Sequence, residues 1–172
     1  MQGLTSRLDS RSRVSGVEGY KNGTMRDTDI AYIAGFVDGE GWVGVSRSKH
    51  NKYSRPSYSP LIRVTNTKRG ILEWIQETLG CGFVCKGKRV KTKNDRWKDS
   101  FMWTIGSRNI VRVTGLLMPY IQLKKRQLEI VTQIAKINLS LQESPTGRRN
   151  PQSTERELAR LWGELGELNK RG

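Results

Sequence analysis

The sequence predicts an α+β fold in which a curved, antiparallel four-stranded sheet is backed by helices. Three observations lead to this prediction. Four segments alternate apolar and polar residues with the period of a strand, and five others place apolar residues at the spacing of a helix. Most basic side chains lie on the strand-like segments and their loops, so helices are expected on one face of the sheet only. A chain of 172 residues is long enough for one domain with a buried core.

The two periods alternate along most of the chain. The predicted elements are a helix at residues 30–38, strands at 42–47 and 61–65, a helix at 69–79, strands at 83–86 and 101–105, and helices at 107–117, 123–140 and 154–169. The order is therefore α-β-β-α-β-β-α-α-α. Residues 1–26 have neither period and are rich in Ser, Arg and Gly, so we expect a basic, mostly disordered arm there and a single domain over residues 27–172.

Capping and breaking residues set the limits of the first elements. Asp27 or Thr28 can cap the first helix, because the oxygen of either side chain accepts a hydrogen bond from a free backbone amide. Gly39 and Gly41 are expected to end that helix. The segment of residues 51–59 is polar and contains a proline, so it is predicted to be the long tip of a hairpin that joins the first two strands.

Similar signals mark the later elements. Gly80 stops the second helix, and a basic loop at residues 88–99 separates the third and fourth strands. Pro119 separates the next two helices. Thr154 and Glu157 have the spacing of a capping box for the last helix.

The charge of the chain is concentrated in its central part. The sequence has 31 basic and 16 acidic residues, a formal net charge of +15. Residues 27–41 carry four acids and no base, whereas residues 42–106 carry 14 basic and four acidic side chains. A basic block of this density on strands and loops is typical of a protein that binds a polyanion, and nucleic acid is the first candidate. General solubility or an acidic membrane surface would be the alternatives.

Other features of the composition exclude several classes of protein. No apolar run approaches the roughly 18 residues of a membrane span, and the basic amino end is not followed by an apolar segment, so no secretory signal is expected. Cys81, Cys85 and His50 are too few for a four-ligand zinc site. We expect no membrane partner and a reducing intracellular setting, in the cytoplasm, the nucleoid or an organelle matrix.

An acidic segment at residues 33–41 reads Ile-Ala-Gly-Phe-Val-Asp-Gly-Glu-Gly. It resembles the signature motif of the LAGLIDADG homing endonucleases, with small residues, two acids two positions apart and a closing glycine. The predicted elements of residues 28–140 have the αββαββα order of that family's core, and the spacing of Pro119, Lys124 and Gln127 resembles a pattern near its third core helix. We find one copy of the motif. The resemblance implies a homodimer, because single-copy members of the family pair two chains.

The residue pattern of this helix agrees with close pairing of two helices. Ala31 and Gly35 lie four positions apart on one face with Ala34 beside them, so another helix can approach closely. We expect Ala31, Ala34, Gly35 and Asp38 at the dimer interface, with packing inside one chain as the alternative. Asp38 and Glu40 stand at the negative end of the helix dipole, where carboxylates are disfavoured unless a cation lies beside them.

The resemblance also implies roles for the acids and for a polar residue on the second strand. Glu40 corresponds to the metal-ligating acid, which is more often Asp, and the Gly39 carbonyl is a second ligand. The implied cofactor is Mg²⁺ or another divalent cation, such as Mn²⁺, or Ca²⁺ in a non-cleaving complex. Asp38 corresponds to the acid that holds the helix end and the hairpin together. Asn66 corresponds to the residue that organises the attacking water, although it could equally be a plain turn residue.

Basic residues complete the implied catalytic set. Lys68 or Arg69 would steady charge on the phosphate, and the sequence does not choose between them. Lys124 matches the family's active-site lysine. The alternative for Lys124 is membership of a solvated basic trio with Lys125 and Arg126.

Alternation sorts the strand residues into two faces. Residues expected to face the helices are Val43, Val45, Ile62, Val64, Val84, Phe101, Trp103 and Ile105. The expected DNA contacts, on the other face and at the strand ends, are Trp42, Ser46, Ser48, Lys49, Ser59, Leu61, Arg63, Lys86, Lys88, Arg89, Met102 and Thr104. A two-stranded ribbon fits the major groove, and Arg63 is the best candidate for reading a guanine there. Most of the lysines would contact phosphate.

Together these features favour a divalent-metal-dependent, site-specific DNA endonuclease. By resemblance, it would act as a homodimer on a long, nearly palindromic duplex, leave 3′ overhangs and be encoded by an intron. One alternative is an RNA maturase of the same fold that binds its intron RNA. The other is a basic nucleic-acid-binding protein without enzymatic activity, which would explain the charge but not the acidic helix end.

Overall fold

The computed structural model describes residues 25–52, 54–87, 99–143 and 152–170. Within them the chain forms α1 (Asp27–Glu40), β1 (Gly41–Ser48), β2 (Ser57–Asn66), α2 (Arg69–Leu79), β3 (Phe83–Lys86), β4 (Phe101–Gly106), α3 (Ser107–Leu117), α4 (Lys125–Glu143) and α5 (Gln152–Lys170). The predicted α+β order is confirmed. Residues 1–24, most of the predicted arm, lie outside the described residues. None of the described helices combines the length and the apolar character that crossing a membrane requires.

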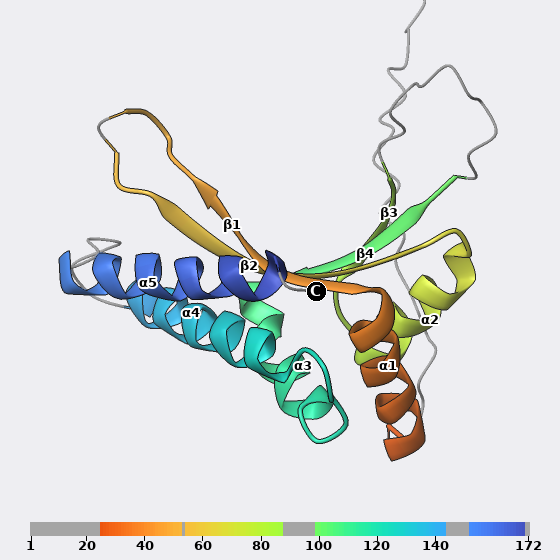
Figure 1. Ribbon diagram of the computed structural model, residues 1–172. Helices are drawn as coiled ribbons and strands as arrows, with labels where there is room; N and C mark the ends of the chain where they lie inside the picture. The colour runs from red at the N-terminus through yellow and green to blue at the C-terminus, as the bar shows by residue number, and fades with distance from the viewer. Residues whose placement is uncertain (1–24, 53, 88–98, 144–151, 171–172) are drawn as a thin grey trace, which may run out of the picture.

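The four strands form one antiparallel sheet in the order β1-β2-β4-β3. Gly41 pairs with Val64 at one end of the β1–β2 pair and Ser48 pairs with Ser57 at the other, while β4 joins β2 from Leu61 onward. Figure 1 shows the β1–β2 pair and the β3–β4 pair spreading apart, with the helices gathered below them. One face of the sheet is therefore packed on helices, and no described helix covers the other.

The core lies between the helices and the inner face of the sheet. Ile33 of α1, Ile62 of β2 and Trp103 of β4 are fully buried there. The Trp103 indole N–H donates a hydrogen bond to the Cys81 carbonyl, 3.0 Å away. Gly82 has φ of 88°, and a Cβ at this position would stand 2.8 Å from Trp103 Cε2, so only glycine fits beside the indole.

The predicted alternation of the strands is confirmed for the inner face. Val43, Ile62, Val64, Trp103 and Ile105 are buried, and Val45, Val84 and Phe101 are half-buried and pack against the core. This pattern leaves the alternate positions of each strand facing away from the helices.

The first helix differs from the prediction at both ends. It begins at Asp27 after Arg26, without a side-chain cap, so neither Asp27 nor Thr28 caps it. It also continues through Gly39 to Glu40. Gly39 does not end the helix, because carbonyls of the last turn have a partner from another element, as described below. Gly41 follows the last helical residue, as predicted. A Cβ at this position would stand 2.9 Å from Val37 Cα, so the close approach of the backbone requires glycine.

Two other boundaries also differ. Strand β2 starts at Ser57 and includes Pro60, in the segment predicted to be a connection. Proline is tolerated there because β2 pairs only with β1 before Leu61, so one side of the strand needs no backbone donor. Helix α5 already includes Gln152, so Thr154 lies inside the first turn and is not the predicted cap.

Candidate active site and nucleic-acid interface

The Asp38 side chain fastens the end of α1 to the turn before α4. It is only 9% exposed, and its carboxylate accepts hydrogen bonds from three successive backbone amides. The donor–acceptor distances are 2.7 Å from Gln122, 3.2 Å from Leu123 and 3.0 Å from Lys124. Asp38 therefore faces the chain's own interior, where it has a structural role.

Lys124 contacts the same helix end from the other direction. Its ammonium donates to the carbonyl oxygens of Val37, at 3.0 Å, and Asp38. These carbonyls belong to the last turn, where a cation is favoured by the helix dipole. Burial lowers the pKa of Lys124, while the negative charges of Asp38 and Glu40 act in the opposite direction. The lysine thus lies within the electrostatic reach of both acids.

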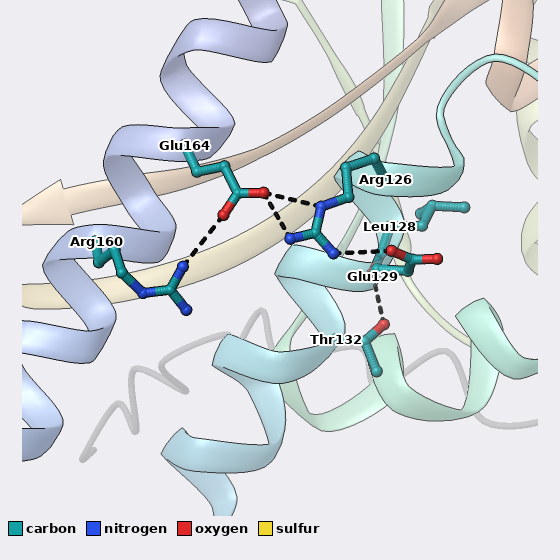
Figure 2. Close-up of polar contacts among 6 residues, drawn as sticks. All are labelled: Arg126, Leu128, Glu129, Thr132, Arg160 and Glu164. Carbon is teal, nitrogen blue, oxygen red and sulfur yellow. Dashed lines mark hydrogen bonds and ion pairs between the residues drawn. The ribbon is translucent and has the colours of Figure 1, made fainter.

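The neighbouring basic residues point elsewhere. Lys125 is exposed. Figure 2 shows Arg126 between two acids: it donates to Glu164 of α5 at 2.6 and 2.8 Å and to Glu129 at 3.0 Å, and Glu164 also meets Arg160. This network joins α4 to α5. Lys124 is therefore distinct from the other two members of the basic trio.

Glu40 is the last residue of α1 and is exposed. Nearby, the last-turn carbonyl of Gly39 has no amide partner within the helix. A carboxylate and a backbone carbonyl are the hard oxygen ligands that Mg²⁺ and Ca²⁺ prefer, so these two groups fit such a cation. Within the described part of the chain, no three His, Cys, Asp or Glu side chains come together as a metal cluster. The remaining ligands would have to come from water, phosphate oxygens or a second chain.

The other predicted catalytic residues lie between the end of β2 and the first residue of α2. Gly41 pairs with Val64, so Asn66 stands two residues further along β2, at the same end of the strand pair as Glu40. Its side-chain oxygen accepts the Lys68 backbone N–H at 2.8 Å, which makes Asn66 a turn-forming residue and leaves its amide group for other contacts.

The two candidate basic residues beside Asn66 differ in their contacts. The Arg69 guanidinium is 2.8 Å from the Glu73 carboxylate and lies over the Phe101 ring, 5.9 Å from its centroid. Lys68 is exposed. Arg69 is also exposed, but the structure gives its guanidinium intrachain partners.

A row of four side chains crosses the outer face of the sheet. Trp42 of β1 pairs with Arg63 of β2, Arg63 with Thr104 of β4, and Thr104 with Phe83 of β3. Phe83 is 57% exposed and was not among the predicted contacts. The sequence did contain a signal for Phe83: neighbouring residues of a strand face opposite sides of the sheet, so an inward Val84 places Phe83 on the outer face. Thr104 is on the predicted face but is buried, so it is not openly presented to a ligand.

The remaining predicted contacts fall into three groups. Ser46, Ser48, Lys49 and Ser59 are exposed, and Leu61 and Met102 are half-buried. Lys86 is exposed but its ammonium is 2.7 Å from the Asp99 carboxylate. Lys88 and Arg89 lie outside the described residues.

The exposed side of α1 differs in part from the predicted interface. Gly35 is exposed and Ala31 is half-buried, but Ala34 is fully buried within the chain and Asp38 is turned inward. The reason is geometric: adjacent residues on a helix are about 100° apart, so Ala34 and Gly35 face different sides. Gly39 is also exposed, and a Cβ at Gly35 or Gly39 would meet no atom within 4 Å. These two glycines, with Ala31, form a smooth free face.

Comparisons with known proteins agree with this architecture. Residues 27–117 match the family model of the LAGLIDADG-like domain. The DNA endonuclease I-CvuI of Chlorella vulgaris is 33% identical over 110 residues, which cover 62% of this chain and 63% of that protein. The chain thus spans less than two thirds of that relative's length in this match.

Solved structures show the same fold. The homing endonuclease I-CvuI, in complex with its target in the presence of 2 mM Ca, has a TM-score of 0.64 at 26% identity, covering 83% of this chain and 82% of that chain. The archaeal intron-encoded homing endonuclease I-Vdi141I, complexed with DNA, has a TM-score of 0.64 at 21% identity, covering 85% of this chain and 87% of that chain.

Proposed function

Because the chain belongs to the LAGLIDADG homing endonuclease family, we propose that it is a site-specific, divalent-metal-dependent DNA endonuclease. It acts as a homodimer on a long, nearly palindromic duplex, makes a staggered double-strand break with 3′ overhangs, and is encoded by an intron. The observation that carries this proposal is the exposed Glu40 carboxylate, within electrostatic reach of Lys124, at the point where α1 leads directly into β1 of the basic sheet.

The outer face of the sheet binds the duplex. Its strands and strand ends carry exposed hydroxyl and basic side chains, including Ser46, Ser48, Lys49 and Ser59. A curved antiparallel ribbon fits the major groove, where hydroxyl and guanidinium groups contact base edges while lysines neutralise phosphates. Because lysines contact phosphates, the affinity for DNA depends on salt. Because few side chains contact bases, the sequence specificity depends on a few residues such as Arg63.

The acids at the end of α1 prepare the hydrolytic site. Glu40 and the Gly39 carbonyl would hold Mg²⁺, which when bound activates water and stabilises the leaving oxygen in phosphodiester hydrolysis. Asp38 keeps the helix end in place through its three backbone hydrogen bonds. Lys124 adds positive charge within reach of Glu40, and the free amide group of Asn66 orients the attacking water.

Two copies of the chain are needed to cut both strands. Each protomer supplies one Glu40, and the smooth face formed by Ala31, Gly35 and Gly39 lets two α1 helices approach closely about a two-fold axis. Tyr32 stands beside this face, 55% exposed, with its ring packed on Phe36 and Trp74. Its apolar surface would be covered by the partner.

The direct test is cleavage of a plasmid library in Mg²⁺ by the purified full-length protein, followed by mapping of the ends. We expect discrete double-strand ends with 3′ overhangs at related sequences. Binding of duplex DNA without any discrete ends would favour a non-enzymatic binding protein. Preferential binding of a structured intron RNA, with no cleavage of DNA, would favour the maturase.

A further inference from the structure

The indole of Trp42 lies flat on the outer face of its own strand. Trp42 is 41% exposed, and its ring covers Gly44, two residues further along β1. A Cβ at Gly44 would overlap the Trp42 ring, standing 2.7 Å from Cε2 and closer still to the outer ring carbons. The lack of a side chain at Gly44 therefore creates the seat for the indole. Gly44 itself is buried under it although it faces outward.

Arg63 is stacked on this seated indole. Trp42 and Arg63 are directly opposite each other in the β1–β2 register, and the guanidinium carbon is 5.2 Å from the ring centroid. A cation over an aromatic face at this distance is attracted by the ring's negative face. The stack restricts the long side chain of Arg63, which otherwise samples many rotamers.

Two polar atoms next to the stack lack partners. Among the described residues, Arg63 Nε and Thr104 Oγ1 are buried and neither has a hydrogen-bond partner. Arg63 and Thr104 are opposite each other in the β2–β4 register, so both unsatisfied groups lie in the same row of the outer face. Buried polar groups are normally paired. Because no described side chain holds Arg63 by a hydrogen bond at Nε, the contact with the Trp42 ring is the interaction that positions the guanidinium.

We propose that Trp42 is a positioning residue that, seated on Gly44, holds the Arg63 guanidinium in the orientation that reads one guanine in each half of the DNA target. The inference rests on the proposed function and adds its specificity determinant. A bidentate contact to guanine O6 and N7 requires the plane of the guanidinium to match the plane of the base. An arginine already held on a ring loses less conformational entropy when it makes that contact.

The proposal distinguishes Trp42 from a residue that only adds affinity. If the indole merely contacted the sugar-phosphate backbone, its loss would weaken binding to all sequences alike. If it positions Arg63, its loss reduces discrimination at the base read by Arg63 and leaves the other positions of the half-site unchanged.

The experiment measures binding of the full-length protein to every single-base variant of the target half-site. Arg63→Ala first identifies the base pair at which discrimination is lost. Trp42→Ala is expected to reduce discrimination at that same pair by about three- to tenfold, with Trp42→Phe, which keeps a ring, close to the wild type. Replacing the guanine by 7-deazaguanine, which lacks N7, should weaken the wild type more than Trp42→Ala.

Gly44→Ala provides an independent test through the seat. The added methyl group must displace the indole, so this variant is expected to lose discrimination at the Arg63 base pair as Trp42→Ala does. In the Trp42→Ala background the same methyl group has no ring to displace, and Gly44→Ala should then add no further loss. A simple structural role for Gly44 would make the two losses add. Unchanged circular dichroism spectra establish that the variants are folded.

The following results would overturn the proposal. They are equal loss at all base pairs in Trp42→Ala, no loss at the Arg63 pair, and additive losses in the double variant. Tighter binding by Trp42→Ala would also overturn it, because the indole would then shield Arg63 from DNA. Failure of the proposed function gives a different result: the wild type itself would bind all DNA sequences equally. The role proposed for Trp42 would then be wrong as well.

Discussion

Asp38 and Lys124 are joined by two reciprocal hydrogen bonds, each between the side chain of one residue and the backbone of the other. The Asp38 carboxylate accepts the backbone N–H of Lys124, while the Lys124 ammonium donates to the backbone carbonyl of Asp38. The two hydrogen bonds join the end of α1 to the start of α4 across 86 positions of sequence. Glu40 lies two residues after Asp38 in the chain, so the position of the proposed metal-binding carboxylate depends on these two hydrogen bonds.

Asp38→Ala tests the contribution of this contact to stability. The change leaves three backbone amides without their acceptor, and hydrogen bonds to a charged group are the strong ones. We expect a loss of about 2–4 kcal/mol in the free energy of unfolding, measured with urea. Asp29→Ala, which removes an exposed ion pair with Arg26 in the same helix, should cost less than about 1 kcal/mol. Equal losses in the two variants would contradict the role of Asp38.

Lys124 is expected to couple stability to alkaline pH. Burial lowers the pKa of Lys124 in the folded protein. Between this lowered pKa and the ordinary lysine value, the unfolded chain binds more protons than the folded one, so stability rises with pH over that interval. The free energy of unfolding of the wild type, minus that of Lys124→Met, should therefore increase as the pH is raised through this interval.

The exposed neighbour Lys125 provides the control for this measurement. The difference between the wild type and Lys125→Met should increase less over the same interval, because the exposed Lys125 side chain does not lie against buried carbonyls. A wild-type advantage over Lys124→Met that falls with rising pH would mean that the charged form of Lys124 is the favoured one in the folded protein.

Gly35→Leu is expected to separate assembly from folding. The position is exposed and has no atom within 4 Å of a Cβ, and leucine favours a helix more than glycine by roughly 0.8 kcal/mol. The monomer should therefore stay folded, but the larger side chain would hold two α1 helices apart. Sedimentation should give a dimer for the wild type and a monomer for Gly35→Leu. Gly163→Leu, at an equally open position in α5, should remain a dimer.

DNA affinity is expected to fall steeply with salt. If six to ten phosphates are neutralised by the sheet and its loops, the affinity should drop by about 10³–10⁵ between roughly 50 and 200 mM salt. Lys49→Ala should make the slope less steep, because Lys49 is exposed just beyond β1. Lys136→Ala, at an exposed position of α4 beside α3, should not change it. An affinity that hardly responds to salt would argue against the basic sheet as the binding surface.

Sequence periodicity predicted the fold well because each strand packs one face on the core. Ile62, Val64 and Trp103 recur at the strand period and are all buried. Errors arose where a distant residue supplies what local sequence lacks. Gly39 reads as a helix end, yet Lys124 contacts the last turn from another element and the helix continues to Glu40.

The site was predictable only in part for a related reason. The motif indicated Glu40, and its neighbour Asp38 was assigned to the helix end where it is found. Periodicity could not reveal which side of α1 its own chain would cover, and so Ala34 was placed on the free face. Nor could it reveal that Trp42 covers Gly44, because that contact depends on a rotamer and not on a repeat.

Glu40→Gln tests the proposed chemistry. The substitution keeps the size of the side chain but removes the negative charge that would hold a divalent cation. Folding and dimerisation should be unchanged within about 1 kcal/mol, since a neutral group is easier to place at the carboxyl end of a helix. DNA binding in metal-free buffer should be equal or tighter, because a negative charge near the phosphates is gone. Cleavage in Mg²⁺ should fall by several orders of magnitude.

The control for Glu40→Gln is Glu77→Gln, which neutralises an exposed carboxylate of α2 and should leave cleavage intact. Binding retained with cutting lost, in Glu40→Gln alone, is the pattern expected of a residue that acts in chemistry. Near-normal cleavage by Glu40→Gln would place the metal elsewhere in the protein. Loss of folding together with cleavage would instead make Glu40 a second structural acid beside Asp38, and a maturase that binds RNA without cutting DNA would then explain the chain better.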